Sequence, residues 1–150
     1  ETERPDLDVT AMAPVGRLNV VAHQFSRQMG KVFSRHGLNS AGFDVLATLR
    51  RSPPPHALTA GELMESMMIT SGTMTNRIDQ LVKAGHVVRK SDTSDARRTL
   101  VKLTPNGKRL IDKAVAEHVV NQASLLEGLD DSERQTLDRL LRKLLASCTS

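Results

Sequence analysis

The sequence of 150 residues contains no tryptophan, no tyrosine and only three phenylalanines. Proteins that bind single-stranded nucleic acid usually stack bases on aromatic side chains, so this mode of binding is disfavoured. The single cysteine, Cys148, rules out a disulfide framework and a zinc site of several thiolates, and it fits a reducing compartment. No apolar run approaches roughly 18 residues and no signal-peptide pattern is present, so we expect a cytoplasmic protein without a membrane span.

Motifs that carry catalysis are also missing from the sequence. The five histidines show neither HExxH spacing nor the spacing of paired metal ligands, and no Ser/His/Asp order suggests a nucleophile elbow. A glycine-rich phosphate loop is absent as well. We therefore expect a protein that is not an enzyme and that uses no cofactor or metal.

What the sequence does contain is a regular pattern of helices. Apolar residues along 12–33 are spaced by four and three positions, which predicts one long helix with a seam of coiled-coil type. Gly37 stands where a left-handed helix end belongs. A shorter helix is expected over 40–52, because the prolines that follow it remove backbone donors and end the helix.

Two further helices are expected at the C-terminal end of the sequence. Thr104 and Pro105 are typical of a helix start, and this helix is expected to run to about Glu127. A last helix with a leucine-rich side follows. Ser132 and Gln135 are expected to form the capping box at its start.

In the middle of the chain, two short helices joined by a tight turn form a helix-turn-helix pattern. The first is expected over about 58–67, with a capping box of Thr59 and Glu62. The second, which we call the recognition helix, is expected over about 71–84.

The recognition helix carries two different faces. Its apolar residues recur at helical spacing: Met74, Ile78, Leu81 and Val82. A second face holds only hydrogen-bonding side chains: Thr73, Asn76, Arg77 and Gln80. A solvated helix usually mixes glutamate and lysine at such positions, whereas these side chains can bind a base edge or a phosphate.

The sequence then changes from a helical to an alternating period. Residues 86–90 and 98–104 are β-prone and enclose a turn-rich segment, which predicts a β-hairpin. Between Arg89 and Arg109 the chain holds seven basic and two acidic residues, so the excess positive charge is concentrated in this hairpin and its exit. Such a surface attracts duplex phosphates and releases their counterions.

The order helix, turn, helix and basic hairpin predicts a DNA-binding lobe over 38–104, with a wing over about 86–104. The recognition helix is expected in the major groove, where Asn76 can pair with adenine and Arg77 with guanine or a phosphate. The hairpin is short enough for the minor groove, where arginine is favoured. Further DNA contacts are expected from Ser71, Thr73, Thr75, Arg97 and Arg98. Replacing either wing arginine should weaken all DNA binding alike.

The segment DARRTLVKLTPNGKRL (95–110) resembles the signature of the MarR family of bacterial winged helix-turn-helix regulators. It has the Asp-any-Arg spacing, the strand VKLT and a helix opened by PNG, and the resemblance covers nearly the whole chain. It implies a single mainly α-helical domain over 1–150 with a small β-hairpin wing, braced by Asp95 and Arg97. It also implies that 1–37 and 105–150 form dimerisation helices, which agrees with leucine-rich seams that lack a partner in a small winged helix.

The same resemblance implies how such a protein works. A homodimer would bind a pseudo-palindromic operator, with half-sites about one helical turn apart. It would act as a repressor of its own promoter and a neighbouring gene, and a small molecule would release it from the DNA.

One branch of the family is especially similar, namely the urate-responsive regulators of the PecS and HucR type. The similar segments are ERPDLD, FDVLATLRRS and SGTMTNRIDQL. In that branch an anionic effector sits between the DNA-reading lobe and the dimer lobe, and the positions that match its effector residues are Asp44, Arg77 and Arg89. The branch also uses a tryptophan upstream of ERPDLD. Since this sequence has none, either it starts downstream of that tryptophan or the effector differs from urate.

An anion at these positions would be repelled by Asp44 and attracted by Arg77 and Arg89. Because Arg77 cannot serve an effector and DNA equally well, effector binding would shift the recognition helix away from its DNA-bound geometry. Two other roles remain open. Asp44 can be an ordinary acid in the first turn of a helix, and Arg89 can contact a phosphate or solvent.

The sequence leaves open two alternatives to an anionic effector and one alternative to DNA binding itself. A redox switch would use Cys148, which lies near Arg142 and Lys143 in the sequence. A metal-responsive regulator would use His118 beside Glu117. A helical protein-interaction module without DNA binding is the alternative from another class, and promoter binding that weakens steeply with salt discriminates it from a regulator.

Overall fold

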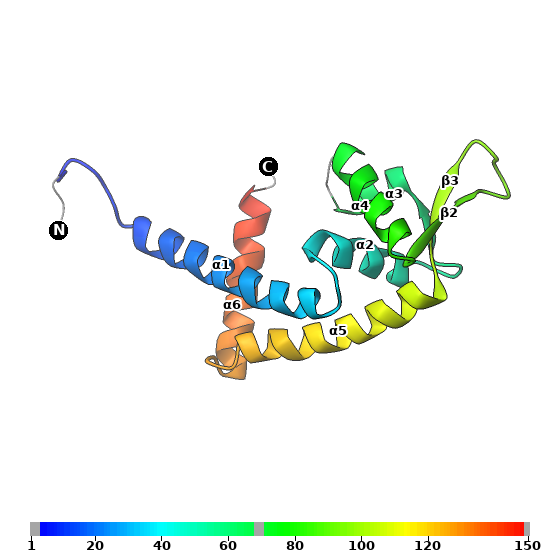
Figure 1. Cartoon of the computed structure of the whole chain (residues 1–150). Helices are drawn as coiled ribbons and strands as arrows, with labels where there is room; N and C mark the ends of the chain where they lie inside the picture. Colours follow the sequence, from blue (N-terminus) through cyan, green and yellow to red (C-terminus); the bar gives the residue numbers. More distant parts are fainter. Residues whose placement is uncertain (1–3, 68–70, 149–150) are drawn as a thin grey trace.

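The computed structural model describes residues 4–67 and 71–148. Its elements, in chain order, are α1 (Met12–Arg35), α2 (Ser40–Arg51), β1 (Ala57–Thr59), α3 (Ala60–Met67), α4 (Ser71–Lys83), β2 (Val87–Ser91), β3 (Thr99–Leu103), α5 (Pro105–Leu125) and α6 (Asp131–Cys148). In Figure 1, α2, α3, α4 and the strands gather at one end, α1 and α6 lie at the other, and α5 connects the two. This mainly α-helical fold with a small sheet confirms the predicted fold class.

The long helix α1 ends in the way the sequence predicts. Gly37 adopts a left-handed φ of 69°. The Leu38 amide donates to the Phe33 carbonyl at 3.0 Å, and the Gly37 amide donates to Ser34 at 3.0 Å. These two bonds form a Schellman motif, which turns the chain directly into α2.

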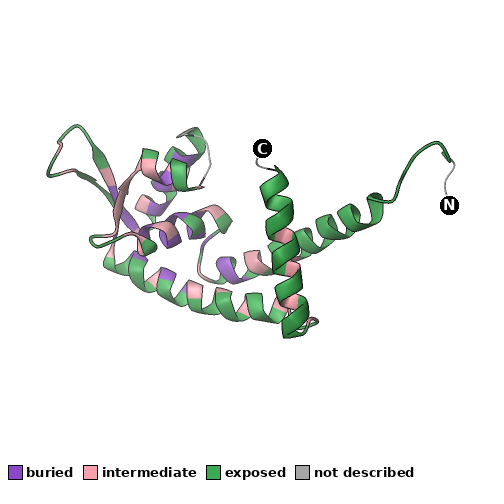
Figure 2. Ribbon diagram, turned by 180° about the vertical axis from the view of Figure 1, so that it is seen from behind, coloured by how far each residue is buried: buried purple, intermediate pink, exposed green. Residues whose placement is uncertain are grey.

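The hydrophobic core lies at the end of the molecule that holds the short helices and the sheet. Leu46 and Leu49 of α2, Leu63 of α3, Met74 of α4 and Ile111 of α5 are completely buried. Figure 2 shows most of the buried residues in this part, whereas α6 has no buried residue among those described and most of α1 is exposed. The core therefore holds the helix-turn-helix and the wing as one packed unit.

The sheet contains a strand that the sequence analysis did not predict. Its order is β1-β3-β2, with both neighbours antiparallel to β3. The helix expected from Leu58 begins instead at Ala60, because Ala57–Thr59 pairs with β3. The Thr59–Glu62 capping box is confirmed, since the Glu62 amide donates to Thr59 Oγ1 at 3.1 Å and the Thr59 amide donates to Glu62 Oε1 at 3.3 Å.

At the C-terminal end, the predicted start of α5 is confirmed, because Thr104 Oγ1 accepts the Gly107 amide at 2.9 Å and Pro105 is the first helical residue. The capping box predicted for α6 is wrong. It is formed by Asp130 and Glu133, with the Glu133 amide on Asp130 Oδ1 at 2.8 Å and the Asp130 amide on Glu133 Oε1 at 3.0 Å. An aspartate accepts such bonds as well as the expected serine does, so Asp130 caps the helix and α6 begins at Asp131.

Helix α6 packs little against the rest of its own chain. None of its described residues is buried, and Leu140, Leu144 and Leu145 are exposed. Across residues 4–67 and 71–148, no helix is long and apolar enough to cross a membrane.

Candidate nucleic-acid interface

Helix α4 places its two faces as the sequence predicts. Met74, Ile78 and Leu81 are buried in the core. The side chains of the opposite face are largely exposed: Thr73, Thr75, Asn76 and Gln80. The side chain of Ser71 and the turn at 68–70, both part of the predicted helix-turn-helix, lie outside the described residues. The described part of α4 therefore presents these polar side chains to the surroundings over about two helical turns.

Arg77 differs from the other residues of the polar face because it is only partly exposed. Its helical position lies beside that of Leu81, at the border between the two faces. The Nε atom of Arg77 is buried, and no group of the described residues accepts a hydrogen bond from it. Buried polar atoms of proteins are normally satisfied by a protein group or by ordered water.

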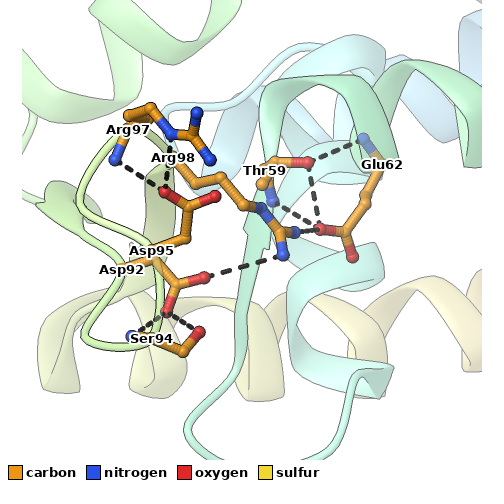
Figure 3. A network of polar contacts seen from close by, with 7 residues as sticks. All are labelled: Thr59, Glu62, Asp92, Ser94, Asp95, Arg97 and Arg98. Carbon is orange, nitrogen blue, oxygen red and sulfur yellow. Dashed lines mark hydrogen bonds and ion pairs between the residues drawn. The ribbon is translucent and has the colours of Figure 1, made fainter.

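The wing is tied to the helix-turn-helix by Arg98, as Figure 3 shows. Its Nη2 donates to Glu62 Oε1 at 2.8 Å, and its Nη1 lies 3.6 Å from Asp92 Oδ2. The same Glu62 oxygen accepts the Thr59 hydroxyl at 3.0 Å. One carboxylate therefore serves both the start of α3 and the wing.

The two acids in the wing loop have separate tasks. Asp92 Oδ1 accepts the amide and the hydroxyl of Ser94, and these bonds hold the pKa of Asp92 below its usual value. Asp95 Oδ1 accepts the amide of Arg97 at 3.0 Å and its Nε at 3.2 Å. The side chain of Arg97 is 92% exposed. The loop thus fixes the backbone of Arg97 while its guanidinium remains open to a ligand.

Arg97 and Arg98 have the same expected role in the sequence analysis but different surroundings in the structure, and the difference leads to a prediction. Arg97→Ala is expected to weaken binding to all DNA sequences and to lower the salt slope by about one, because the substitution removes an exposed cation that can neutralise a phosphate. Arg98→Ala is expected to leave the salt slope nearly unchanged, because Arg98 is only half-exposed and is paired with two carboxylates, Glu62 and Asp92. Arg97 is paired with Asp95 alone and is almost fully exposed. The Arg98 variant should weaken binding only by loosening the wing. Fluorescence anisotropy over a salt series measures both.

A double-mutant cycle provides the control for this prediction. Glu62→Ala and Arg98→Ala should be strongly non-additive in DNA affinity, because they break one ion pair. Glu62→Ala and Arg97→Ala should be nearly additive. Equal salt slopes for the two arginine variants would contradict the separate roles.

The three residues matched to an effector site face different neighbours. Asp44 lies on α2, where desolvation raises the pKa of its carboxyl while Arg51 and His118 act in the opposite direction. Arg89 of β2 donates to Asp79 Oδ1 of α4 at 2.5 Å. A cavity of about 80 Å³ lies beside Arg77, and neither Asp44 nor Arg89 lines it. In the described residues, no hydrogen bond or ion pair joins any two of the three.

Two residues that join elements of the candidate interface could not be identified as such from the sequence, namely Glu62 and Asp79. Glu62 was identified only as a helix cap, because nothing in the sequence relates it to an arginine 36 positions later. Asp79 was not considered, although it holds Arg89 against α4. In the part of the chain that the structure describes, no group of three or more His, Cys, Asp or Glu side chains gathers in metal-binding geometry.

A helix-turn-helix with an exposed polar second helix, followed by a two-stranded basic wing on the same core, is a winged helix-turn-helix. This class of fold places one helix in the major groove and supports it from the side. The profile of the MarR family matches residues 36–98.

Known proteins agree with this classification. The chain is 38% identical to the HTH-type transcriptional regulator PecS of Dickeya dadantii over 142 residues, or 95% of this chain and 86% of PecS. A mutant MarR from E. coli, solved in complex with operator DNA, superposes with a TM-score of 0.77 at 29% identity, covering 91% of this chain and 97% of that one. AbsC from Streptomyces coelicolor shares the fold, with a TM-score of 0.84 at 20% identity over 95% of this chain and 97% of AbsC.

The chain therefore belongs to the MarR family of transcriptional regulators. The predicted family and its PecS-like branch are confirmed. The relatives are named as regulators and not as enzymes.

Proposed function

We propose that this protein is a homodimeric repressor that binds a pseudo-palindromic operator in the cytoplasm and is released by a small anion. The observation that carries the proposal is the exposed polar face of α4 beside a wing that presents Arg97. Each protomer would bind one half-site, about one helical turn from the other. The complex of E. coli MarR with operator DNA supports this mode of action for the fold.

The dimer is supported by apolar surface that the protomer leaves uncovered. Large hydrophobic side chains are exposed on the three helices outside the DNA-binding lobe: Met12, Val15, Leu18, Val20, Val21, Val119, Val120, Leu140, Leu144 and Leu145. A stable monomer rarely exposes so many large apolar residues on adjoining helices. A second copy related by a two-fold axis would cover the same surface on both protomers.

The DNA contacts are assigned from exposure and chemistry, except that Ser71, whose side chain lies outside the described residues, is assigned from chemistry alone. Asn76 and Arg77 would contact base edges, while Ser71, Thr73 and Thr75 would contact phosphates or thymine edges in the major groove. Arg97 would enter the minor groove from the wing. Arg98 would contribute by holding the wing in place, through its bond to Glu62.

The sharpest test of this interface uses two residues of α4. Asn76→Ala and Arg77→Ala are expected to abolish the preference for the operator, because each removes a side chain whose pairing with a base is worth about 1–3 kcal/mol. Binding to unrelated duplex DNA should persist, because phosphate contacts supply it. Footprinting on the intergenic DNA beside the gene, with anisotropy on operator and random duplexes, measures both.

Gln135→Ala on the exposed side of α6 is the matched control for these variants and should bind like the parent protein. Footprints that are equal for the parent and the Asn76 and Arg77 variants would refute the assignment. A protein that binds no promoter duplex even at low salt would instead be a helical interaction module.

The effector is proposed to be a small anion such as urate, with Arg77 as its main ligand and Asp44 and Arg89 as further members of the site. Since Asp44 and Arg89 face other neighbours, they could join Arg77 only after α2 or the wing moves. Release of DNA needs only that the effector favour the non-DNA geometry by about 1–3 kcal/mol.

Titration of urate, xanthine and small polycarboxylates against the protein–operator complex tests the effector. Dissociation by one of them, reduced in Asp44→Asn and Arg89→Ala, is the expected result. If none of these compounds dissociates the complex, or if Asp44→Asn and Arg89→Ala respond like the parent, those roles are wrong.

A further inference from the structure

An acidic residue, Asp79, stands on the exposed side of the recognition helix. It lies three positions after Asn76 and four after Thr75, so helical spacing places it on the same side of α4 as these two polar residues. Its side chain is 51% exposed. The sequence of α4 contains no other acidic residue. An acid at this position is unexpected on a surface proposed to meet DNA, because duplex phosphates repel it.

The partner of Asp79 comes from the wing. Arg89 of β2 donates to Asp79 Oδ1 through its Nη2. In the sheet, Arg89 stands opposite Val101 of β3 and two residues after Val87, so the alternation of strand side chains places it on the same side as these two valines. Both valines belong to the core that also contains the apolar face of α4. Arg89 therefore lies between the wing and the recognition helix, and its guanidinium is 39% exposed there.

The shape of a duplex gives this place its importance. The recognition helix is proposed to occupy the major groove, and the wing the adjacent minor groove. One phosphate strand separates two adjacent grooves, so this strand would pass between α4 and the wing, where Asp79 and Arg89 meet. An arginine at that point can bind a phosphate of any sequence. Asp79 competes with the phosphate for the same guanidinium.

We propose that Asp79 determines specificity in DNA binding, by holding Arg89 away from a phosphate contact that every duplex offers and by fixing the spacing between α4 and the wing. Phosphate contacts strengthen binding to all sequences alike, whereas bases are read only where α4 and the wing enter both grooves in register. The inference rests on the proposed function, because it requires that α4 and the wing meet a duplex. Asp79 acts through Arg89 and is thus a positioning residue.

The test uses Asp79→Ala in the full chain, since alanine is favourable in an exposed helix and leaves Arg89 without its acceptor. On a random duplex, the variant is expected to steepen the log–log salt dependence by about 0.9, because the released arginine adds one phosphate contact. Its affinity should therefore gain about eightfold over the parent for each tenfold reduction in salt. The ratio of operator affinity to random affinity should fall, by up to about fivefold, because the ion pair that fixes the spacing is lost. Fluorescence anisotropy on both duplexes over a salt series measures these changes.

Two further variants isolate the release of Arg89 from other effects. Asp138→Ala in α6 removes an acid that is likewise paired with an arginine, since Asp138 Oδ2 lies 2.7 Å from Arg142 Nη2. This pair lies outside the DNA-binding lobe, so the variant should retain the salt slope of the parent. Asp79→Ala combined with Arg89→Ala should also return to the parent slope, because the cation that gains the contact is then missing.

Three results would overturn the proposal. The first is an unchanged slope for Asp79→Ala on the random duplex. The second is a slope that steepens equally when Arg89 is also replaced, because Asp79 would then act by repulsion alone. The third is an operator-to-random ratio equal to that of the parent. Each of these leaves the proposed function standing as long as the parent protein protects its operator in a footprint, whereas a parent that binds no promoter duplex even at low salt refutes both.

Discussion

Leu144→Asp in α6 is expected to convert the protein from a dimer to a monomer and to abolish operator binding at submicromolar concentration. Leu144 is 52% exposed in the protomer, so the substitution should leave the protomer folded. In a dimer the same side chain would be covered by the second copy. Burial of one leucine is worth about 1.5–3 kcal/mol.

In a two-fold interface each substitution is present in both protomers, so its effect on the free energy of dimerisation is doubled. The dimer should therefore lose about 3–6 kcal/mol, which is two to four powers of ten in dissociation constant. Operator affinity falls with it, because a single protomer holds only one half-site. Sedimentation velocity and anisotropy on the operator measure the two effects.

Gln135→Asp is the matched control, since it adds the same charge on the exposed polar side of the same helix. This variant should remain dimeric and bind the operator like the parent. A parent protein that sediments as a monomer at micromolar concentration would contradict the proposed assembly, as would a Leu144→Asp variant with an unchanged dimer constant.

Gly107→Ala is expected to destabilise the protein by about 3 kcal/mol or more, at the upper end of what overpacking costs. A Cβ atom at this position would lie 2.0 Å from the His86 carbonyl oxygen and 3.0 Å from Leu103 Cδ1. The oxygen belongs to the backbone, so no change of rotamer can relieve the clash. The first turn of α5 would have to separate from the turn after α4.

That separation would break further bonds. The Thr104 amide donates to the His86 carbonyl at 3.1 Å, and the Thr104 hydroxyl donates to the Gly85 carbonyl at 2.7 Å. Thermal and urea unfolding measure the destabilisation. Gly30→Ala in α1 is the control, because no atom lies within 4 Å of the new Cβ, and it should unfold like the parent or slightly later. Equal stability of Gly107→Ala and the parent would show that the joint is not rigid.

Periodicity and capping residues were sufficient to predict much of this fold. Interactions between residues close in sequence determine three of its features: the two faces of α4, the left-handed Gly37 and the Thr104–Pro105 start of α5. Such interactions can be predicted from the sequence. The strand β1 could not be predicted in this way. It has only three residues, and it exists because β3 offers it a free edge.

The candidate interface shows the same division. The exposed polar stripe of α4 was predictable because helical spacing determines which side chains share a face. The pairing of Arg98 with Glu62 and the pairing of Arg89 with Asp79 were not, because each joins residues from different elements. Sequence composition counted these arginines as equally available to DNA, whereas tertiary contacts leave Arg97 as the more open cation.

Helix α5 gives the molecule a long lever. Its 21 residues span about 31 Å at 1.5 Å per residue. The first turn of this rod rests on the chain just after the recognition helix, and its far end carries the exposed Val119 and Val120. Tilting α5 by about 5° about its far end would displace its first turn, next to the recognition helix, by about 3 Å. This distance is close to the 3.4 Å step between successive base pairs. In the proposed dimer, a very small change in how the two copies meet would therefore be enough to shift each recognition helix relative to its proposed half-site.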